Sequence, residues 1–409
     1  MPLLPPAALA GGLAAALVAA GRVVHSLLTR GPAGLFNDFY AYWGAAVLLN
    51  RGRDPYDINE LAAVQHAAGL HVTTGGGYSY PLFFAEMLRP LGLLQPRVAA
   101  AVFAGISLAA GMIAVALLLG SWADMRPAVV IAAGAIAGLF PPLIGSLYFG
   151  QANLLVLLAL ALAFRSRIPE TMVALAATVK LYPASGLIAS AVRRRWAALA
   201  AAVALLAVLI GIPQVLNRGS LLPRSGYFLG PDTYWSNESI NGFLSRLALP
   251  STWTRPPLPG LPVEVLVLVG AGLLLVATVV ICLRAGGRPY AGCLALSLWL
   301  GSVVAPKNSL WNFTPLLLGI AFAFPRLRNR PLPLLLGAGG WLMIELQAQL
   351  DSARETIYRS DPMLSWLSSI GFYGALLIGV VIAWALVMPR RRLLPRPSPS
   401  PGIRGTSPA

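Results

Sequence analysis

Cysteine and histidine are almost absent from this chain of 409 residues. Its two cysteines, Cys282 and Cys293, lie in or beside apolar runs, and its three histidines, His25, His66 and His71, lack the spacing of metal ligands. This pattern excludes a disulfide framework and a metal framework. The sequence also contains no DxD, HExxH, Walker or GxSxG motif. We therefore predict no bound metal and no cofactor.

Charged residues are scarce as well, at 11% of the chain against 57% hydrophobic residues. No soluble domain hides so much apolar surface, so the composition predicts an all-α polytopic membrane protein embedded in the lipid bilayer. Basic residues outnumber acidic ones by 30 to 14, which gives a net charge of +16. The arginines form short groups between apolar runs, as the positive-inside rule describes. The excess positive charge is thus typical of membrane topology, and we predict no nucleic-acid partner.

Apolar segments near the spanning length of about 20 residues recur along the whole chain. They lie at about 5–28, 81–94, 97–119, 127–146, 151–165, 169–192, 196–213, 261–283, 290–306, 310–325, 331–350 and 365–388. Twelve full crossings leave Arg165 and Arg167 on the outer side, against the positive-inside rule. If 81–94 and 169–192 are re-entrant, both arginines return to the cytoplasmic side. The sequence leaves both topologies open, with about 10–12 transmembrane helices.

The chain is expected to form one transmembrane domain, residues 1–388. Two loops, 29–80 and 214–260, are long enough to be more than connectors, and both fall on the extracytoplasmic side in these topologies. The end of the chain, 389–409, is basic and rich in proline and serine, which predicts a disordered cytoplasmic tail. The first apolar run lacks a charged n-region and a clear cleavage site, which predicts a retained span.

The first long loop contains aromatic and aliphatic residues at helical spacing over 38–50. Asn37 or Asp38 is a plausible N-cap and Gly52 a stop signal, so we predict a short amphipathic helix at the membrane interface. A second short amphipathic helix is expected after Asp57, which also has the residue type of an N-cap.

Lysine is the rarest basic residue, because 28 of the 30 are arginines. Lys180 and Lys307 both occur inside apolar runs. A charge at the centre of a membrane helix costs at least about 2.5–3.5 kcal/mol, so such residues usually mark a substrate pathway. Pro183 disturbs the helix beside Lys180 and frees backbone groups there, which suits a phosphate anion. The alternative is a lysine that snorkels to the interface, which is easier for Lys307 at the end of its span.

Asp38 is the first carboxylate of the chain and directly follows the first apolar segment, beside Tyr40, Tyr42 and Trp43. Aromatic rings that partly desolvate a carboxylate raise its pKa, and such a group can act as general base toward a sugar hydroxyl. Aspartate is also a common helix N-cap. The residues alone weigh these two roles evenly, and the roles can coexist.

Two further local patterns involve polar side chains. Gln151 and Asn153 follow Gly150 at the start of an apolar helix, which suits either a polar turn or hydrogen bonding to a sugar. Glu86 and Arg89 stand at i,i+3 on one helical face, so a local ion pair is expected there.

Four stretches resemble glycosyltransferase family 87, the polytopic GT-C-type enzymes that include α-mannosyltransferases using polyprenyl-phosphate-mannose. They are DFYAYWGAAVLLNRGRDPYD at 38–57, YSYPLFFAEMLRPLGLL at 78–94, YFGQANLLVLLALALAFRSR at 148–167 and ATVKLYPASGLI at 177–188. The stretches follow the family order across the first half of the chain. The aspartate-plus-aromatic loop and the GQxN segment are fairly specific in combination.

The resemblance implies a GT-C-like fold and a multi-pass enzyme of the plasma membrane. The expected reaction is an inverting, metal-independent transfer of a hexose, mannose first, from a polyprenyl-phosphate donor to a glycolipid or cell-wall glycan acceptor on the outer face. Asp38 matches the position of the family's proposed base, and Lys180 matches a basic position suited to the donor phosphate. We expect further substrate contacts from seven side chains: Tyr42, Trp43, Tyr80, Gln151, Asn153, Tyr182 and Asn312.

The late loop departs from the family. Many members carry a Trp-x-His-His-like segment there, whereas this chain reads PKNSLWNF at 306–313, without histidine. Lys307 or Asn312 would then supply the donor contact, or the chain uses another donor or has lost activity. A lipid or solute transporter is a further alternative, because charges in broken helices also mark transporter sites.

Overall fold

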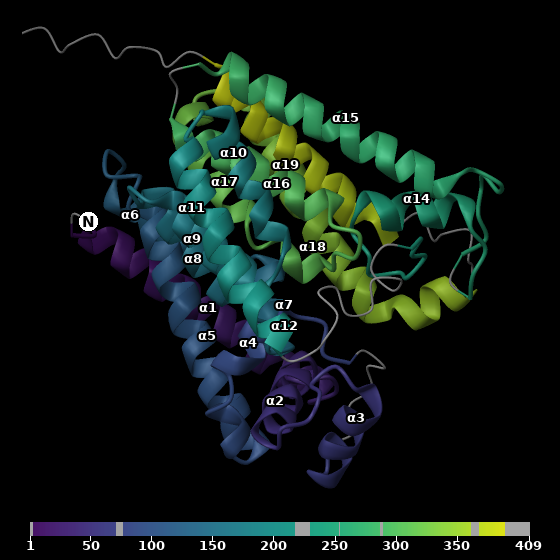
Figure 1. Ribbon diagram of the computed structural model, residues 1–409. Coiled ribbons are helices and arrows are strands. Elements are labelled where there is room, and N and C mark those ends of the chain that lie inside the picture. Colours follow the sequence, from purple (N-terminus) through teal and green to yellow (C-terminus); the bar gives the residue numbers. More distant parts are fainter. Residues whose placement is uncertain are drawn as a thin grey trace, which may run out of the picture.

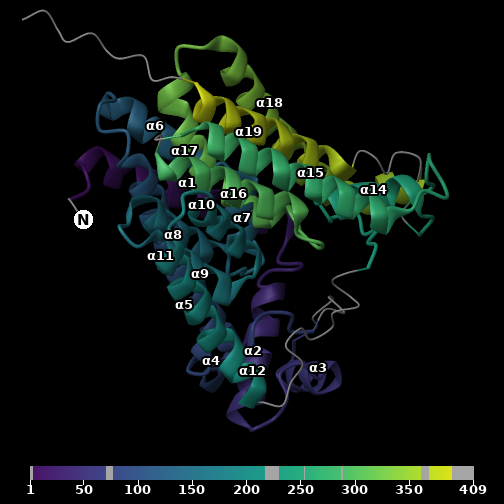
Figure 2. The same ribbon diagram turned by 45° about the horizontal axis from the view of Figure 1, so that its top comes forward.

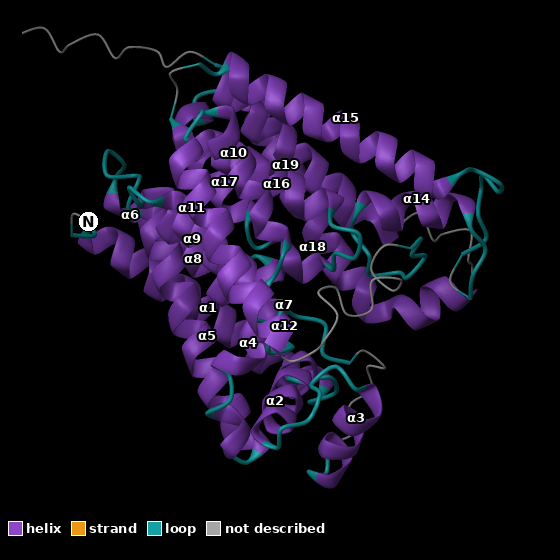
Figure 3. Cartoon of the chain, viewed as in Figure 1, coloured by secondary structure: helices purple, strands orange, loops and turns teal. Residues whose placement is uncertain are grey.

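The computed structural model describes residues 3–70, 77–216, 230–252, 254–286, 289–360 and 368–388, with the backbone alone for 351–360. Within these ranges the regular structure is helical, as Figure 3 shows. One isolated antiparallel β-bridge joins Asn237 to Ser309. The all-α prediction is therefore confirmed. The predictions for His71 and for the tail at 389–409 fall outside the described residues.

The helices of the first half are α1 (Pro6–Arg30), α2 (Asn37–Asn50), α3 (Ile58–Ala67), α4 (Leu82–Met87), α5 (Pro96–Leu119), α6 (Pro127–Gly138), α7 (Pro141–Tyr148), α8 (Asn153–Arg165), α9 (Pro169–Val179), α10 (Leu187–Val192), α11 (Trp196–Leu206) and α12 (Ile212–Leu216). The second half contains α14 (Ile240–Ala248), α15 (Val263–Arg284), α16 (Tyr290–Val304), α17 (Leu316–Leu327), α18 (Pro331–Ser360) and α19 (Ile370–Val387). Short 3₁₀ segments lie at Leu91–Leu93, Tyr182–Gly186 and Leu310–Phe313, and a π-helical turn at Ala207–Gly211 joins α11 to α12.

Six helical stretches among the described residues are long and apolar enough to cross a membrane. They are Pro6–Arg30, Pro96–Leu119, Trp196–Leu216, Val263–Arg284, Leu310–Leu327 and Ile370–Val387. A seventh is formed if α6 and α7, which meet at an angle of 52° before Pro141, count as one broken span. Unbroken spans are fewer than the apolar segments of the sequence because α8 and α16, with 13 and 15 residues, are short and because prolines break 127–146 and 169–192. A polytopic membrane protein is nevertheless what the structure shows.

The segment 169–192 does not cross the molecule, because its two ends lie side by side. Glu170, at the start of α9, pairs with Arg195 just after α10, with Oε1 to Nε 2.9 Å apart. Ser190, near the end of α10, donates a hydrogen bond to the same carboxylate at 2.8 Å. The chain runs inward along α9, turns at Lys180 and the 3₁₀ segment, and returns along α10. Of the two predicted topologies, this hairpin agrees with the one in which 169–192 is re-entrant.

The segment 81–94 also returns to its starting side. Tyr80, which precedes it, shares a hydrogen bond with Tyr42 of α2, and Trp43 donates its indole N–H to the carbonyl of Leu94 at the other end. Both ends therefore meet neighbouring residues of one helix. α4, with six residues, is far shorter than the roughly 20 residues that a span requires.

With these two hairpins, Arg165, Arg167 and Arg195 lie at one end of the molecule, whereas Arg51, Arg53 and Arg89 lie beside α2 and α3. Arg165 donates to the carbonyl of Leu117 near the end of α5, and Arg195 donates to the carbonyl of Arg167. Trp122, in the loop after α5, donates to the carbonyl of Ala321 and so brings the last turns of α17 to the same end. Figure 1 and Figure 2 both show α10 and α17 at the end opposite to α2 and α3. We call these the basic end and the α2–α3 end.

Helix α2 forms as the sequence predicts, but it is not an interfacial amphipathic helix. Its residues are buried on nearly every face, because α3, α4, α5 and the 3₁₀ turn at 91–93 pack around it. The stop at Gly52, with a φ of +67°, and the start of α3 at the N-cap Asp57 match the prediction. α3 is the amphipathic one, with Leu61 and Val64 buried against α2. The predicted ion pair of Glu86 with Arg89 is confirmed at 3.3 Å.

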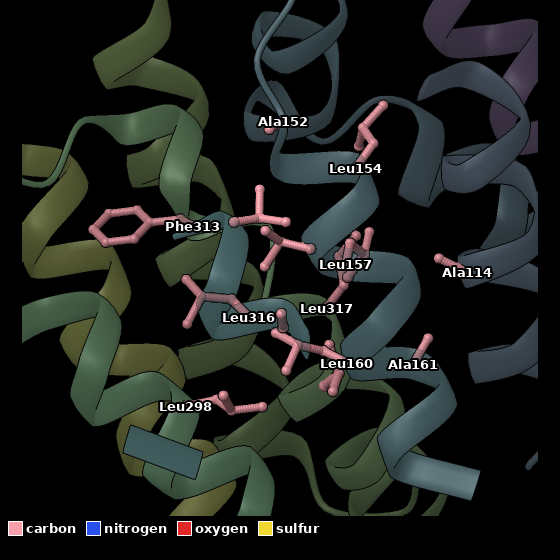
Figure 4. Packing of buried hydrophobic residues seen from close by; sticks show 14 of the residues in the cluster. Ala114, Ala152, Leu154, Leu157, Leu160, Ala161, Leu298, Phe313, Leu316 and Leu317 are labelled. Atoms are coloured by element: carbon pink, nitrogen blue, oxygen red, sulfur yellow. The ribbon is translucent and has the colours of Figure 1, made fainter. Parts of the chain in front are cut away.

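Helix α8 lies in the centre of the hydrophobic core. Its leucines Leu157 and Leu160 are fully buried and lie near Leu316 and Leu317 of α17, as the close-up in Figure 4 shows. α5 packs along another side of α8, and α9 along a third. The first turn of α8 is therefore held rigidly, and its first residue, Asn153, carries a polar side chain of the site described below.

Glu170→Gln tests the closure of the hairpin. The substitution keeps the shape of the side chain but removes the charge that pairs with Arg195, so we expect the free energy of unfolding to fall by about 2 kcal/mol. The measurement is thermal denaturation of the purified protein in detergent. Glu264→Gln, at an exposed position in the first turn of α15, is the matched control, with an expected loss below about 1 kcal/mol. Equal melting temperatures for the two variants would contradict this role of Glu170.

Candidate active site

Four segments that lie far apart in the sequence meet around one polar network. Asp38 comes from the first turn of α2, Gln151 from the junction of α7 and α8, Lys180 from the tip of the hairpin and Asn312 from the 3₁₀ segment before α17. Gln151 Nε2 donates to Asp38 Oδ2 at 2.5 Å, and Lys180 Nζ donates to Gln151 Oε1 at 3.4 Å. Lys180 Nζ also donates to Asn312 Oδ1 at 2.6 Å. One carboxamide thus separates a carboxylate from an ammonium group.

Asp38 is not the N-cap of its helix. The N-cap position belongs to Phe36, in the left-handed region with a φ of 57°, and no side chain caps the helix there. The backbone N–H groups of Asp38 and Phe39 are instead satisfied by the carbonyl of Phe149. The carboxylate is therefore left for Gln151, and the prediction of Asp38 as an N-cap is wrong.

The turn after α7 brings Gln151 to Asp38. Gly150 has a φ of +66°, and a Cβ at this position would lie 2.7 Å from the Cβ of Phe39. Only glycine fits this close approach without strain. The backbone N–H of Gln151 donates to the carbonyl of Ser146 at 2.8 Å, which closes the turn. The GQ pair of the sequence is thus a packing requirement as well as a source of hydrogen bonds.

Asn153 supports the network from the side. Its amide donates to Gln151 Oε1 at 2.6 Å and to the carbonyl of Trp311 at 2.8 Å. Since Asn153 is fully buried at the start of α8, it connects the rigid core to Gln151 and to the segment that carries Asn312. Ser146, with its hydroxyl 3.0 Å from the Asn153 amide, completes the support.

Lys180 lies where α9 ends and is 9% exposed. Its ammonium is 5.3 Å from the centre of the Tyr80 ring, within the range of a cation–π contact. The next residue, Leu181, is 51% exposed, so the tip of the hairpin reaches the surface of the protein. Lys180 is a buried charge with amide and aromatic partners and with no carboxylate in direct contact among the described residues.

The aromatic residues that the sequence predicted as substrate contacts differ in position. Tyr80 is partly exposed beside Lys180, and its hydroxyl lies 2.7 Å from that of the buried Tyr42. Trp43 is 6% exposed and uses its indole N–H on the carbonyl of Leu94, so it anchors α2. Tyr182 is partly exposed in the 3₁₀ turn that follows Lys180.

Lys307 forms a different pair. Its ammonium is 3.4 Å from Asp232 Oδ2, in the segment before α14. It precedes Asn312 by five residues, and its carboxylate partner is Asp232 rather than Asp38. Asp232 lies in the loop 214–260, which we call the outer loop after its predicted side. The structure therefore brings Asp38, Gln151, Lys180 and Asn312 together and gives Lys307 its own partner.

The electrostatics of Asp38 combine three effects. Burial of the carboxylate by surrounding protein raises its pKa above the ordinary value of 3.8 and outweighs the other two. The hydrogen bond from Gln151 and the positive charge of Lys180 lower the pKa and so limit the rise. Asp38 is half-buried as a residue. A raised pKa in a carboxylate suits a group that takes up a proton.

Ser146 and Trp311 belong to this site, but sequence reasoning did not single them out. Ser146 lies inside an apolar run, and Trp311 contributes its backbone carbonyl, which no side-chain pattern reveals. In the structure a Cβ at Gly145 would clash with the Trp311 ring, so this glycine lets the Trp311 segment approach α7 closely. Among the residues that the structure describes, no group of three His, Cys, Asp or Glu side chains is placed to hold a metal ion.

Comparison with known proteins gives one match. The family model of glycosyltransferase family 87 matches residues 78–306, which is more than half of the chain. This range includes Tyr80, Gln151, Lys180 and the whole hairpin, whereas Asp38 and Asn312 lie outside it. Neither the search of curated proteins nor the search of solved structures finds a match.

Proposed function

The chain belongs to glycosyltransferase family 87 and is thus a membrane glycosyltransferase, and from this premise we propose that it transfers a hexose from a polyprenyl-phosphate donor. The donor sugar is proposed to be mannose, and the acceptor a glycolipid or cell-wall glycan. The observation that carries the proposal is that Asp38 and Lys180 both contact the carboxamide of Gln151, Asp38 at its nitrogen and Lys180 at its oxygen. A base and a fixed cation, held one amide apart, are the two charged groups that such a transfer uses.

The proposed reaction is a single displacement. The acceptor hydroxyl oxygen attacks C1 of the donor sugar while Asp38 accepts the hydroxyl proton. The bond from C1 to the phosphate oxygen breaks, and its electron pair leaves with the polyprenyl phosphate. Attack from the face opposite the leaving group inverts the configuration at C1. Lys180 stabilises the negative charge that develops on the leaving phosphate, so a side chain supplies the positive charge that the step needs.

The position of Lys180 supports a lipid-linked donor. α9 has 11 residues and so spans about 16 Å, roughly half of the 30 Å hydrocarbon core. An ammonium at this depth is costly unless an anion reaches it. A prenyl chain dissolved in the bilayer places its phosphate close to a buried cation, whereas a water-soluble nucleotide sugar must leave water to do so. Substrate hydroxyls can replace the amide hydrogen bonds that Gln151 and Asn312 make in the free protein.

The arginines that gather at the basic end support an active site on the extracytoplasmic side of the plasma membrane. Arg165, Arg167 and Arg195 lie at the basic end, which we assign to the cytoplasm by the positive-inside rule. α2, which carries Asp38, lies at the opposite end, as Figure 1 shows. The acceptor would then approach Asp38 from outside the cell.

Sugar turnover by the purified protein tests this function. In detergent, the protein is incubated with radiolabelled polyprenyl-phosphate-mannose and a glycolipid extract, and the products are separated by chromatography. We expect transfer of label from the polyprenyl donor, with or without EDTA, and none from GDP-mannose. Transfer from GDP-mannose alone would refute the lipid donor, and turnover that stops with EDTA would refute metal independence. No turnover from any donor would favour a transporter or an inactive member of the family.

The pH profile tests Asp38 as the base. Because the carboxylate must be ionised to take up a proton, kcat/KM should fall as the pH drops through the raised pKa of Asp38. Gln151→Leu removes a hydrogen bond that lowers this pKa, so the acid limb of the profile should move to higher pH. The measurement is kcat/KM from pH 4 to pH 8 for wild type, Gln151→Leu and the control Asp124→Asn. An acid limb at the same pH in all three proteins would contradict the assignment.

A further inference from the structure

The segment that carries Asn312 is held by a second polar network, which lies in the outer loop. The carbonyl of Pro306 accepts three side-chain hydrogen bonds, from Asn237 and Asn241 at 3.0 Å each and from Ser239 at 3.3 Å. These three residues lie directly before and within the first turn of α14. Three side-chain donors on one backbone carbonyl fix its position tightly, since each bond must be aligned with the same oxygen.

Asn237 is the centre of this network. Its Nδ2 donates to Asp232 and to Pro306, and its Oδ1 accepts from the backbone N–H of Asn308 at 3.2 Å. The backbone continues the pairing, because Asn237 bridges to Ser309 in antiparallel fashion and the N–H of residue 238 donates to the carbonyl of Asn308 at 2.7 Å. Asn237 is 3% exposed. Its amide therefore uses all its donors and acceptors inside the protein.

The held segment leads directly into the candidate active site. Asn312 follows Ser309 by three residues, and its backbone N–H donates to the carbonyl of Ser309 at 2.9 Å. Its side chain then accepts from Lys180 at 2.6 Å. The 3₁₀ segment Leu310–Phe313 is short and has no side-chain cap, so its placement depends on what holds its two ends.

We propose that residues 232–241 form a brace that positions Asn312 and, through it, the ammonium of Lys180, with Asn237 as the positioning residue. Lys307 belongs to the brace rather than to the donor site, because its pairing with Asp232 joins the same two segments. The kinetic part of this inference rests on the proposed function.

The consequence for catalysis is a change in donor use. If the brace is weakened, Asn312 shifts and Lys180 no longer points at one fixed place. A displacement of this kind far from the reacting atoms lowers kcat/KM for the donor, and we expect about a tenfold loss. The loss should act through Lys180, so the effects of the two sites should not add.

The test uses two variants and two readouts. Asn237→Asp keeps the acceptor oxygen and removes the donor to Pro306, and Asn241→Ala removes a second donor without touching Asn237. Hydrogen–deuterium exchange of the amides at 305–313 should become about tenfold faster in Asn237→Asp, with a smaller change in Asn241→Ala. Ser251→Ala, in the same outer loop and hydrogen-bonded to Thr254, is the control with no change.

The kinetic readout is a double-mutant cycle. Asn237→Asp should lower kcat/KM for the donor about tenfold in the wild-type background and less than about twofold in the Lys180→Met background. Unchanged exchange at 305–313 in both brace variants would overturn the inference, whether or not the protein transfers sugar. Additive losses in the cycle would overturn it as well. Absence of sugar transfer by the wild-type protein would refute the proposed function alone, because the exchange measurement still decides on the brace.

Discussion

Asp38→Asn is expected to lower the rate of sugar transfer by a factor of about 10²–10⁴, the range that a positioned base contributes. Asparagine has the same shape but cannot accept the proton of the acceptor hydroxyl. Gln151 can still donate to its side-chain oxygen, so the hydrogen bond that joins α2 to the turn after α7 survives. The expected result is a folded protein that binds donor and acceptor and fails in the chemical step. The measurement is initial rates at saturating donor, together with the melting temperature.

The fold gives this experiment a clear interpretation. Asp38 does not cap α2, and the N–H groups of that helix end are satisfied by a backbone carbonyl. Loss of its charge therefore does not remove a helix cap, which would cost about 1 kcal/mol in stability. Asp124→Asn, at an exposed position in the loop between α5 and α6, is the matched control and should retain full activity. A variant with asparagine at 38 and activity within a few-fold of wild type would remove Asp38 from the mechanism.

The sequence predicted the start and end of helices well where neighbouring residues determine them. The helix at 38–50, its stop at Gly52 and the start of the next helix after Asp57 follow from spacing, a glycine and a capping aspartate. The burial of α2 did not follow, because the elements that cover it come from elsewhere in the chain. Amphipathic spacing indicates an apolar face but does not show whether neighbours cover the other face.

The contacts of the two lysines could not be predicted from the sequence. Both stand in apolar runs, so the sequence assigned both to the donor phosphate. The structure places Lys180 against Gln151 and Asn312, whereas Lys307 pairs with Asp232, which is 75 residues earlier in the chain. A pairing over that distance leaves no mark in either local pattern. The hairpin could be predicted only in part. Pro183 indicated a break in the helix, but the return of the chain is shown by the contact of Glu170 with Arg195.

Lys180→Met is expected to lower kcat/KM for the donor by about 10²–10³, the usual effect of removing a preorganised group that stabilises developing charge. Methionine has nearly the same length and no charge. In the free protein it removes a buried ammonium whose contacts are amides and a ring, so stability should stay the same or rise. Activity should thus fall while the melting temperature does not. Donor saturation curves and thermal denaturation in detergent measure the two quantities.

The second lysine is the internal control for this prediction, because Lys180 and Lys307 are the only lysines of the chain. Lys307→Met removes the ion pair with Asp232, a partly shielded contact worth about 1 kcal/mol or less, so a loss of only a few-fold is expected. The same substitution at two positions then separates a group that faces the donor from a group that holds a loop. Equal losses in kcat/KM for the donor would mean that both ammonium groups reach the phosphate. A large loss at Lys307 and a small one at Lys180 would place the phosphate beside the outer loop and away from Asp38, and the displacement proposed here would then lack its cation.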